Sequence, residues 1–546
     1  MNRYAYSDLP LLALTVSLLA ISFPVQAAEE EDEDWEYNSL ILPTSTVSIG
    51  GIYVSDDNTR FGQYRGLTDD GVYGALDFDI NRRDEETGTW IMLDGRNLGL
   101  DSRELRFEHQ RQGDWRYFLE YDAIPRGEPY TVNTGQTGIG TNNLTINGTA
   151  LRDVDLETKR KAITLGGRKE LKGGWAFETR FRNEEKDGER LFARGGFGGP
   201  TGTFEFLAEP IDSTTRQGEA ILSYTGKALQ LAIGYYGTHY DNSDTALNVT
   251  TVPGPLSSVT PIALAPDNQS HQGYVSGSYK FSPATVGNFK LAYGRATQDD
   301  SFIAPATPGN GDLDGRIDTT QVALGLRSRP LPDLTLRANF RYEDRDDKTP
   351  VRVYLAGGGP TTDGQNEPRS ITTTAGKLEA SYLLPRDFRL TGSVDYEEKE
   401  RNETPIRVVS HRDTTDELTY RAELRRGLSE TLNGALSVSH SKRDGSAFET
   451  TVLTNSAPYS NEIAPIHLAD RDRDQVRLVL DWVPADPLSI QFVADASWDD
   501  YDQRTVNRLG PLEGNAYHFT ADAAYDFSEN VQGTIWYSHD VNEAEQ

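Results

Sequence analysis

Residues 334–343 read Leu-Thr-Leu-Arg-Ala-Asn-Phe-Arg-Tyr-Glu, so apolar and polar side chains alternate along this stretch. Successive side chains of a β-strand point to opposite faces, and the stretch therefore predicts one oily face and one charged face. The same alternation recurs at 388–397 and 488–498. Strands of about ten residues with this pattern are typical of a barrel wall between lipid and a polar interior. A soluble sandwich also alternates, but rarely through so many long strands.

Short and long connections alternate along the chain. Tight turns are predicted at 111–114, 225–227, 385–387, 484–487 and 528–530. Long polar loops are predicted at 123–154, 184–212, 242–268, 300–316, 345–370, 400–412, 443–469 and 502–514. Short periplasmic turns and long external loops are the signature of an outer-membrane barrel. We therefore predict an all-β fold, a large antiparallel transmembrane β-barrel over residues 44–546.

The strand count predicts an incomplete barrel. About 21 to 22 strands are expected, the first near 44–55 and the last near 531–539. A single-chain bacterial barrel has an even number of strands, and a barrel of about 26 would need roughly 125 further residues. Residues 542–546 read as the start of another external loop, so we expect C-terminal truncation and a gap between the first and last strands. The alternative is one missed hairpin within 184–212, at 191–194 and 204–207.

The N-terminus predicts export. Arg3, the apolar run 11–25 and the small-residue box Val25-Gln-Ala27 are typical of a secretory signal peptide over residues 1–27. An N-terminal membrane anchor is the alternative, but the run is too short for a bilayer and Pro24 interrupts it. Residues 28–43 carry a dense acidic run and are expected to form a solvated, disordered periplasmic segment.

Composition excludes several classes of function. The chain has 546 residues, a formal net charge of −30 and no cysteine. Disulfide frameworks, thiolate metal sites and C-x-x-C-H haem attachment are therefore excluded, and the acidic balance argues against nucleic-acid binding. The eight histidines form no H-x-x-x-H or H-E-x-x-H pair, and no nucleophile elbow is present. We expect no enzyme activity and no cofactor or metal of the protein's own.

One acidic loop resembles the opening of a calcium loop. Alternate oxygen-bearing side chains can converge on one hard cation, and here they are Asn310, Asp312, Asp314 and Asp318. Gln321 stands where the closing glutamate of such a loop should be, so an ordinary acidic loop is the alternative.

The charged face of the strands is expected to line the barrel lumen. It mixes both signs, and such a ladder can pair across neighbouring strands or contact a protein held inside. A wide aqueous pore with a merely hydrophilic lining is the alternative. The lumen-facing residues expected to contact a partner are Arg116, Glu120, Arg337, Arg341, Arg389, Asp395, Arg421, Glu423, Arg477 and Asp481.

Several stretches resemble the MtrB/PioB family of decahaem-associated outer-membrane proteins. The more specific ones are Tyr53-Val-Ser-Asp-Asp-Asn-Thr-Arg-Phe-Gly-Gln-Tyr-Arg-Gly-Leu67 and Gly95-Arg-Asn-Leu-Gly-Leu-Asp-Ser-Arg-Glu-Leu105. The stretches at 112–122, 207–212, 315–320 and 341–350 are also similar. The resemblance runs from about residue 44 to the end and is densest before residue 125. Family members often carry a C-x-x-C near the mature N-terminus, where this chain has its acidic run.

The resemblance implies a partner and a function. A family member is expected to sheathe a periplasmic multihaem (decahaem) c-type cytochrome in the outer membrane, and an extracellular multihaem cytochrome is a second implied partner. Electrons would then cross the membrane through the partner's haem, for metal reduction or iron oxidation, with the barrel as a passive scaffold. The alternative function is a passive porin for small solutes.

Overall fold

The computed structural model describes residues 19–24, 44–146, 150–195, 204–251, 258–303, 311–355, 363–366, 368–402, 412–448, 465–502, 510–528 and 531–545. Their secondary structure is almost entirely β-strand, with one short helix, α2 (Thr59–Gly62), and two 3-10 turns at Lys172–Gly174 and Pro385–Asp387. No helix in these ranges is long and apolar enough to cross a membrane. The all-β prediction is confirmed.

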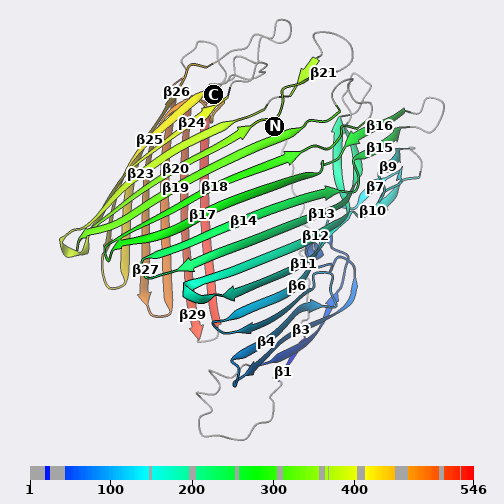
Figure 1. The fold of residues 1–546 in the computed structure, drawn as a ribbon, viewed down its shortest axis with the longest axis horizontal. Coiled ribbons are helices and arrows are strands. Elements are labelled where there is room, and N and C mark those ends of the chain that lie inside the picture. The colour runs from blue at the N-terminus through cyan, green and yellow to red at the C-terminus, as the bar shows by residue number, and fades with distance from the viewer. Residues whose placement is uncertain are drawn as a thin grey trace, which may run out of the picture. The chain divides into compact units, whose positions relative to one another are not determined.

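By its internal contacts the chain divides into two compact units. Unit 1 comprises Met1–Leu222, Gly234–His271 and Gln298–Leu313, and unit 2 comprises Ser223–Ile233, Gln272–Thr297 and Asp314–Gln546. In unit 1 consecutive strands pair antiparallel (Figure 1). They are β1 (Leu19–Pro24), β2 (Thr46–Val54), β3 (Gly71–Asp84), β4 (Thr89–Leu98), β5 (Glu104–Arg111), β6 (Trp115–Gly127), β11 (Glu157–Glu170) and β12 (Trp175–Gly195).

Unit 2 holds the longest run of regular strands (Figure 1). Each strand pairs antiparallel with the next. The strands are β19 (Gly315–Leu331), β20 (Leu334–Asp347), β23 (Ile371–Leu383), β24 (Arg389–Arg401), β25 (Thr414–Gly427), β26 (Leu432–Gly445), β27 (Asp470–Ala485), β28 (Leu488–Asp502), β29 (Glu513–Ser528) and β30 (Val531–Glu545). Four further strands contribute residues to both units: β13 (Phe204–Thr225), β14 (Leu229–Asn242), β17 (Asn268–Ser282) and β18 (Thr285–Gln298).

Within the described residues, the largest sheet contains 22 strands. One of them, β1, lies in the predicted signal peptide and pairs with β2 from Leu19↔Gly51 to Pro24↔Thr46. The other strands reproduce the expected count of about 21. The predicted loop at 184–212 is wrong, because β12 and β13 extend through most of it; they are long strands and add no extra hairpin. Residues 542–545, expected to begin a loop, continue β30.

Four of the five predicted tight turns lie between consecutive strands, and the fifth, at 528–530, lies mostly outside the described residues. Residues 112–114 join β5 to β6, and 226–228 join β13 to β14. The turn at 385–387 contains Arg386 and Asp387 at φ values of 64° and 60°, so these residues adopt the left-handed conformation that closes it. We call the strand ends joined by tight turns the turn end of each unit, and the opposite ends the loop end.

At the loop end of unit 1, segments predicted to be polar loops build a small sheet with its own core. It comprises β8 (Gln136–Thr137), β9 (Asn143–Ile146), β15 (Ala246–Thr251) and β16 (Ser258–Ala263), and β9 pairs parallel with β15. The core side chains are fully buried: Leu144, Leu207, Leu247 and Val249. A two-stranded ladder is also formed in unit 1 by β7 (Val132–Thr134) with β10 (Arg152–Val154), and one is formed in unit 2 by β21 (Val353–Leu355) with β22 (Asp363–Gln365).

A second small core holds the stretch 53–67. Val54, Leu67 and Leu100 are buried together, and the Asn58 side chain caps α2 by accepting a hydrogen bond from the Phe61 amide at 3.0 Å. Asn58 is a favourable N-cap because its amide oxygen satisfies an amide that the helix leaves unpaired. The motif that carries the family resemblance therefore forms a packed segment beside β2 and β3.

A buried ion pair lies at the loop end of β25–β27 in unit 2. Arg412 is 1 % exposed, and its Nη1 contacts Asp470 Oδ1 at 2.6 Å and the Leu468 carbonyl at 2.8 Å. Its Nε donates to the Ser446 carbonyl at 2.7 Å, and the guanidinium lies 4.5 Å from the Phe448 ring centre. These contacts hold three chain segments together.

Candidate functional site

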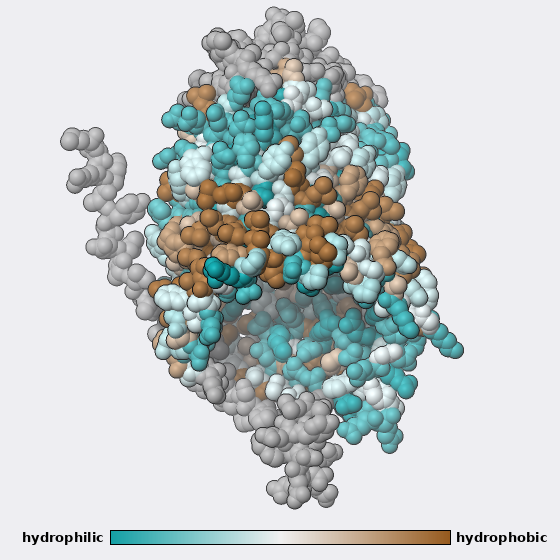
Figure 2. Space-filling view, turned by 90° about the vertical axis from the view of Figure 1, so that its left-hand side faces the viewer, coloured by the Kyte–Doolittle hydropathy of each residue, from teal (hydrophilic) through white to brown (hydrophobic). Residues whose placement is uncertain are grey.

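The sheet of unit 2 has two chemically distinct faces. The pairing register carries the alternation of residues 334–343 across the unit, so that residues of one kind meet in rows. One apolar row runs Leu336, Ala380, Gly392, Ala422, Val438, Val476 and Ala496. Figure 2 shows apolar residues gathered in a band, with hydrophilic residues on both sides of it. We call this side of unit 2 the apolar face.

The polar face carries rows of charged and hydroxyl side chains. One row runs Arg337, Glu379, Ser393, Arg421, Ser439 and Gln475. Each residue of this row is the sequence neighbour of a residue in the apolar row, so its side chain points to the other face of the sheet. The predicted two-faced strand is therefore confirmed, with both faces continuous over several strands.

Ion pairs cross-link the polar face between neighbouring strands. Arg337 Nη1 lies 2.7 Å from Glu379 Oε1, and Lys377 Nζ lies 3.1 Å from Asp395 Oδ1. On β27 and β28, Arg477 and Asp495 approach to 3.9 Å. Asp481 accepts a hydrogen bond from Gln491 at 2.7 Å. These contacts are the cross-strand ladder expected from the sequence.

Two ion pairs reach over an intervening strand. Arg341 on β20 pairs with Glu397 on β24 at 3.0 Å, and it passes above Ala375 of β23, whose side chain is small. Arg471 on β27 pairs with Glu417 on β25 at 2.9 Å across β26. A cavity of about 470 Å³ lies beside the first pair and is lined in part by Ala323, Ala375 and Arg341. Such second-neighbour contacts tie three strands at once.

In unit 1 the predicted residues Arg116 and Glu120 belong to the same kind of face. Glu120 pairs with Arg106 at 2.7 Å, and the Arg106 guanidinium lies 4.5 Å from the Phe118 ring centre. Asp122 on β6 receives two bonds from Arg182 on β12, at 2.9 and 3.0 Å. The Nε of Arg116 is buried and has no hydrogen-bond partner among the described residues.

Other predicted residues are not brought into the ladder. Among the described residues, no ion pair joins Arg389, Arg421 or Glu423 to a partner. Arg389 lies directly opposite Arg425 in the register, and Arg421 lies between Ser393 and Ser439. Arg327, which the sequence prediction missed, lies opposite Arg337 on the same face. We name the turn-end cations as Arg327, Arg389, Arg421 and Arg425.

The cations of the polar face differ in how they are paired. Toward the loop end Arg341 and Arg471 pair with Glu397 and Glu417. Arg401 and Arg443 also lie there, and they donate to hydroxyl and carbonyl oxygens. Toward the turn end Arg337 pairs with Glu379, whereas the four turn-end cations have no ion-pair partner among the described residues. Like charges on directly opposite residues destabilise a sheet, so the Arg389–Arg425 juxtaposition has no structural benefit of its own.

The calcium candidate is not assembled in the described part of the chain. Asn310 lies outside the described residues, and Asp314 pairs with Arg352 at 3.6 Å. Asp318 is surrounded by Arg295, Arg316 and Lys348. Over the residues that the structure describes, no three His, Asp or Glu side chains are grouped as a metal site requires, so Asp312, Asp314 and Asp318 do not converge.

Comparisons with known proteins place the chain among outer-membrane proteins. A family model described as "Putative outer membrane beta-barrel porin, MtrB/PioB" matches residues 53–546. "Outer membrane protein MtrB" of Shewanella baltica (strain OS185) is 28 % identical over 542 residues, covering 94 % of this chain and 75 % of the relative.

Two solved structures are similar at lower identity. The "Copper transporter OprC" is 10 % identical, with a TM-score of 0.48 over 96 % of this chain and 74 % of that one. A mutant of the ferric enterobactin receptor PfeA from Pseudomonas aeruginosa is 12 % identical, with a TM-score of 0.47 over 94 % of this chain and 73 % of that one.

Proposed function

The chain belongs to the MtrB/PioB family of outer-membrane β-barrel proteins, and we propose that its barrel sheathes a periplasmic multihaem c-type cytochrome. The apolar face of its strands then contacts lipid, and the polar face surrounds the partner. Electrons pass between periplasm and cell exterior through the partner's haems. The protein itself acts as an insulating scaffold.

The four turn-end cations, which have no ion-pair partner among the described residues, are the observation that carries this proposal. A periplasmic partner enters from the turn end, because short turns lie on the periplasmic side of an outer-membrane barrel. The four turn-end cations are the groups that such a partner meets first. Haem propionates and surface carboxylates are anions that arginine binds with paired, charge-assisted hydrogen bonds.

In this proposal the c-type haem belongs to the partner. Covalent c-type haem needs cysteine thiols, and the chain has none. Toward the loop end, Arg341 and Arg471 are already paired with Glu397 and Glu417 of the same wall.

Purification from outer membranes tests the proposal. The tagged protein, extracted in mild detergent, should bring down a haem-staining band that is a separate polypeptide. Arg389→Gln/Arg421→Gln should weaken this retention, whereas Lys442→Gln, which removes an exposed cation from the other face of β26, should leave it unchanged. Equal retention by both variants contradicts the role of the turn-end cations, and the absence of any haem band contradicts the sheath.

The porin alternative predicts a different measurement. A passive porin conducts ions freely in a planar bilayer, and added cytochrome does not change its conductance. A sheath whose lumen is occupied conducts poorly, and its conductance rises when the cytochrome is stripped away. Free conductance of the protein as isolated, without any haem-containing partner, favours the porin.

A further inference from the structure

A cluster of charged side chains lies on the apolar face of unit 2, immediately beyond its aromatic residues at the loop end. Arg295 follows Tyr293 on β18 by two residues, and Asp346 follows Tyr342 on β20 by four. Each charged side chain therefore points to the same face of the sheet as its tyrosine. Aromatic residues mark the two membrane interfaces of an outer-membrane barrel. We call Tyr293, Arg295, Arg316, Asp318, Asp346 and Lys348 the rim cluster.

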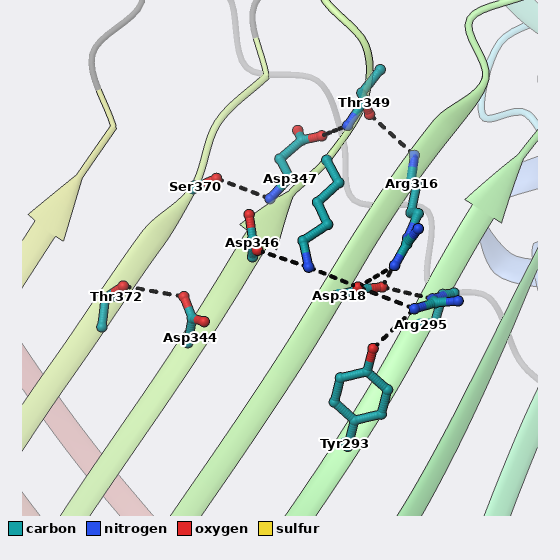
Figure 3. Close-up of polar contacts among 11 residues, drawn as sticks. Tyr293, Arg295, Arg316, Asp318, Asp344, Asp346, Asp347, Thr349, Ser370 and Thr372 are labelled. Carbon is teal, nitrogen blue, oxygen red and sulfur yellow. Dashed lines mark hydrogen bonds and ion pairs between the residues drawn. The ribbon is translucent and has the colours of Figure 1, made fainter.

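Asp318 is the centre of the rim cluster (Figure 3). Arg295 contacts its two carboxylate oxygens at 2.8 and 3.3 Å, and Arg316 contacts them at 3.3 and 2.7 Å. Lys348 Nζ lies 3.2 Å from Asp318 Oδ2 and 3.2 Å from Asp346 Oδ2. The Tyr293 hydroxyl accepts a bond from Arg295 Nη2 at 3.1 Å.

The cluster buries its acid and exposes its cations. The Asp318 side chain is 5 % exposed, whereas those of Arg295, Arg316 and Lys348 are 44, 40 and 46 % exposed. Both arginines bind Asp318 through Nε and Nη2, and among the described residues neither Nη1 has a hydrogen-bond partner. Two guanidinium donors and an ammonium therefore remain available around one point.

The rest of the same rim is acidic. The five charged groups of the rim cluster sum to one positive charge, because three cations meet Asp318 and Asp346. On β24 to β28, most side chains that lie on the apolar face beyond its apolar rows are carboxylates, and Lys442 is a cation among them. The carboxylates are Glu398, Glu400, Asp416, Asp444, Asp472, Asp474, Asp500 and Asp502. Asp344 also lies on this face and accepts a hydrogen bond from Thr372, so the rim cluster is distinguished by its three exposed cations and not by a large net charge.

We propose that the rim cluster binds the phosphate of a phosphorylated glycolipid in the outer leaflet. Its position just outside the aromatic residues is the height of lipid headgroups, and the loop end of an outer-membrane barrel faces the cell exterior. Asp318 holds three flexible cations in place before the lipid arrives, which reduces the entropy that phosphate binding would otherwise cost. The two Nη1 groups and Lys348 Nζ supply charge-assisted bonds to the phosphate oxygens.

Lipid titration of the full-length protein tests this assignment. The protein in phosphatidylcholine nanodiscs is titrated with bisphosphorylated lipid A, and with the same lipid after phosphatase treatment, and bound lipid is counted by native mass spectrometry. Each cation near a lipid surface contributes about fivefold in affinity, so Arg316→Gln/Lys348→Gln should bind roughly 30-fold more weakly. Lys442→Gln, the matched rim control, should bind as tightly as the unmodified protein.

Three further readouts keep the test decisive. If the double variant folds poorly, judged by heat-modifiable gel mobility, Lys348→Gln alone should still bind about fivefold more weakly, because Asp318 keeps both arginines. Equal binding of phosphorylated and dephosphorylated lipid, or equal loss in Lys442→Gln, overturns the proposal. Displacement of the lipid by millimolar inorganic phosphate overturns the lipid assignment, since the site then takes free phosphate.

Discussion

Replacing Arg412 with methionine is expected to open the segments around the Arg412–Asp470 pair, at the loop end of unit 2, without unfolding the strands. Methionine keeps an unbranched apolar stem like that of arginine but lacks the guanidinium. The Asp470 carboxylate, also buried, then loses its 2.6 Å ion pair, and the Leu468 and Ser446 carbonyls lose their donors.

The burial of this pair sets the magnitude. Removing one partner of a buried ion pair costs about 3–5 kcal/mol, because the remaining charge stays desolvated. Almost no discount for solvent screening applies, since Arg412 is 1 % exposed and Asp470 is 3 % exposed. A change of this size raises the population of the locally open state by roughly two to three and a half powers of ten.

Hydrogen exchange measures this opening directly. Peptides covering 412–414 and 466–470 should exchange faster in Arg412→Met, whereas peptides within 418–424 of β25 should not change. The double variant Arg412→Met/Asp470→Leu should recover most of the protection, because it leaves no unpaired charge. If the exchange rates of the peptides covering 412–414 and 466–470 stay within threefold of those in the unmodified protein, the reasoning is refuted.

Three further outcomes are expected. Gly188→Ala should lower the free energy of unfolding by about 1–3 kcal/mol in urea titration, because Gly188 has φ 122° and a Cβ there would lie 2.1 Å from the Glu157 carbonyl oxygen. Gly74→Ala is the control: a Cβ at Gly74 meets open space, so the free energy of unfolding should change by less than about 0.5 kcal/mol. A cysteine introduced at Tyr130 should react with an impermeant maleimide on intact cells and one at Lys227 should not; the reverse pattern would invert the topology. A double-mutant cycle between Arg341 and Glu397 should give a coupling of roughly 0.2–1 kcal/mol because both side chains are more than a third exposed, and a coupling above about 2 kcal/mol would contradict this assignment.

Local periodicity was sufficient to predict the strands. The alternation at 334–343 predicts β20 and its faces, and the turn residues at 484–487 predict the β27–β28 connection, because both depend on residues adjacent in sequence. Polarity alone misjudged residues 184–212, where β12 and β13 continue well beyond their apolar portions. Strand length past the membrane depends on pairing with a neighbour, and composition does not report that pairing.

Contacts between segments that are distant in sequence cannot be predicted from local sequence patterns. The parallel pairing of Asn143–Ile146 with residues near Asn248 joins two loops about a hundred positions apart, and no local pattern signals it. Asp318 was grouped with Asp312 and Asp314 by spacing, whereas its partners come from β18 and from Lys348 beyond β20. The sequence predicts that Arg389 and Arg421 face the lumen, but their lack of carboxylate partners among the described residues follows from the register of three strands.

The second-neighbour ion pairs have a consequence for the alignment of the strands. A slip of one residue between two strands exchanges their faces and is opposed by the hydrophobic effect, but a slip of two residues keeps every apolar side chain on its own side. Charge then supplies the missing discrimination. After a two-residue slip of β23, Arg337 would stand opposite Lys377 or Ser381 in place of Glu379. The Arg341–Glu397 pair depends on the register of three strands at once. Ion pairs that are individually weak therefore act together to favour one register of the sheet.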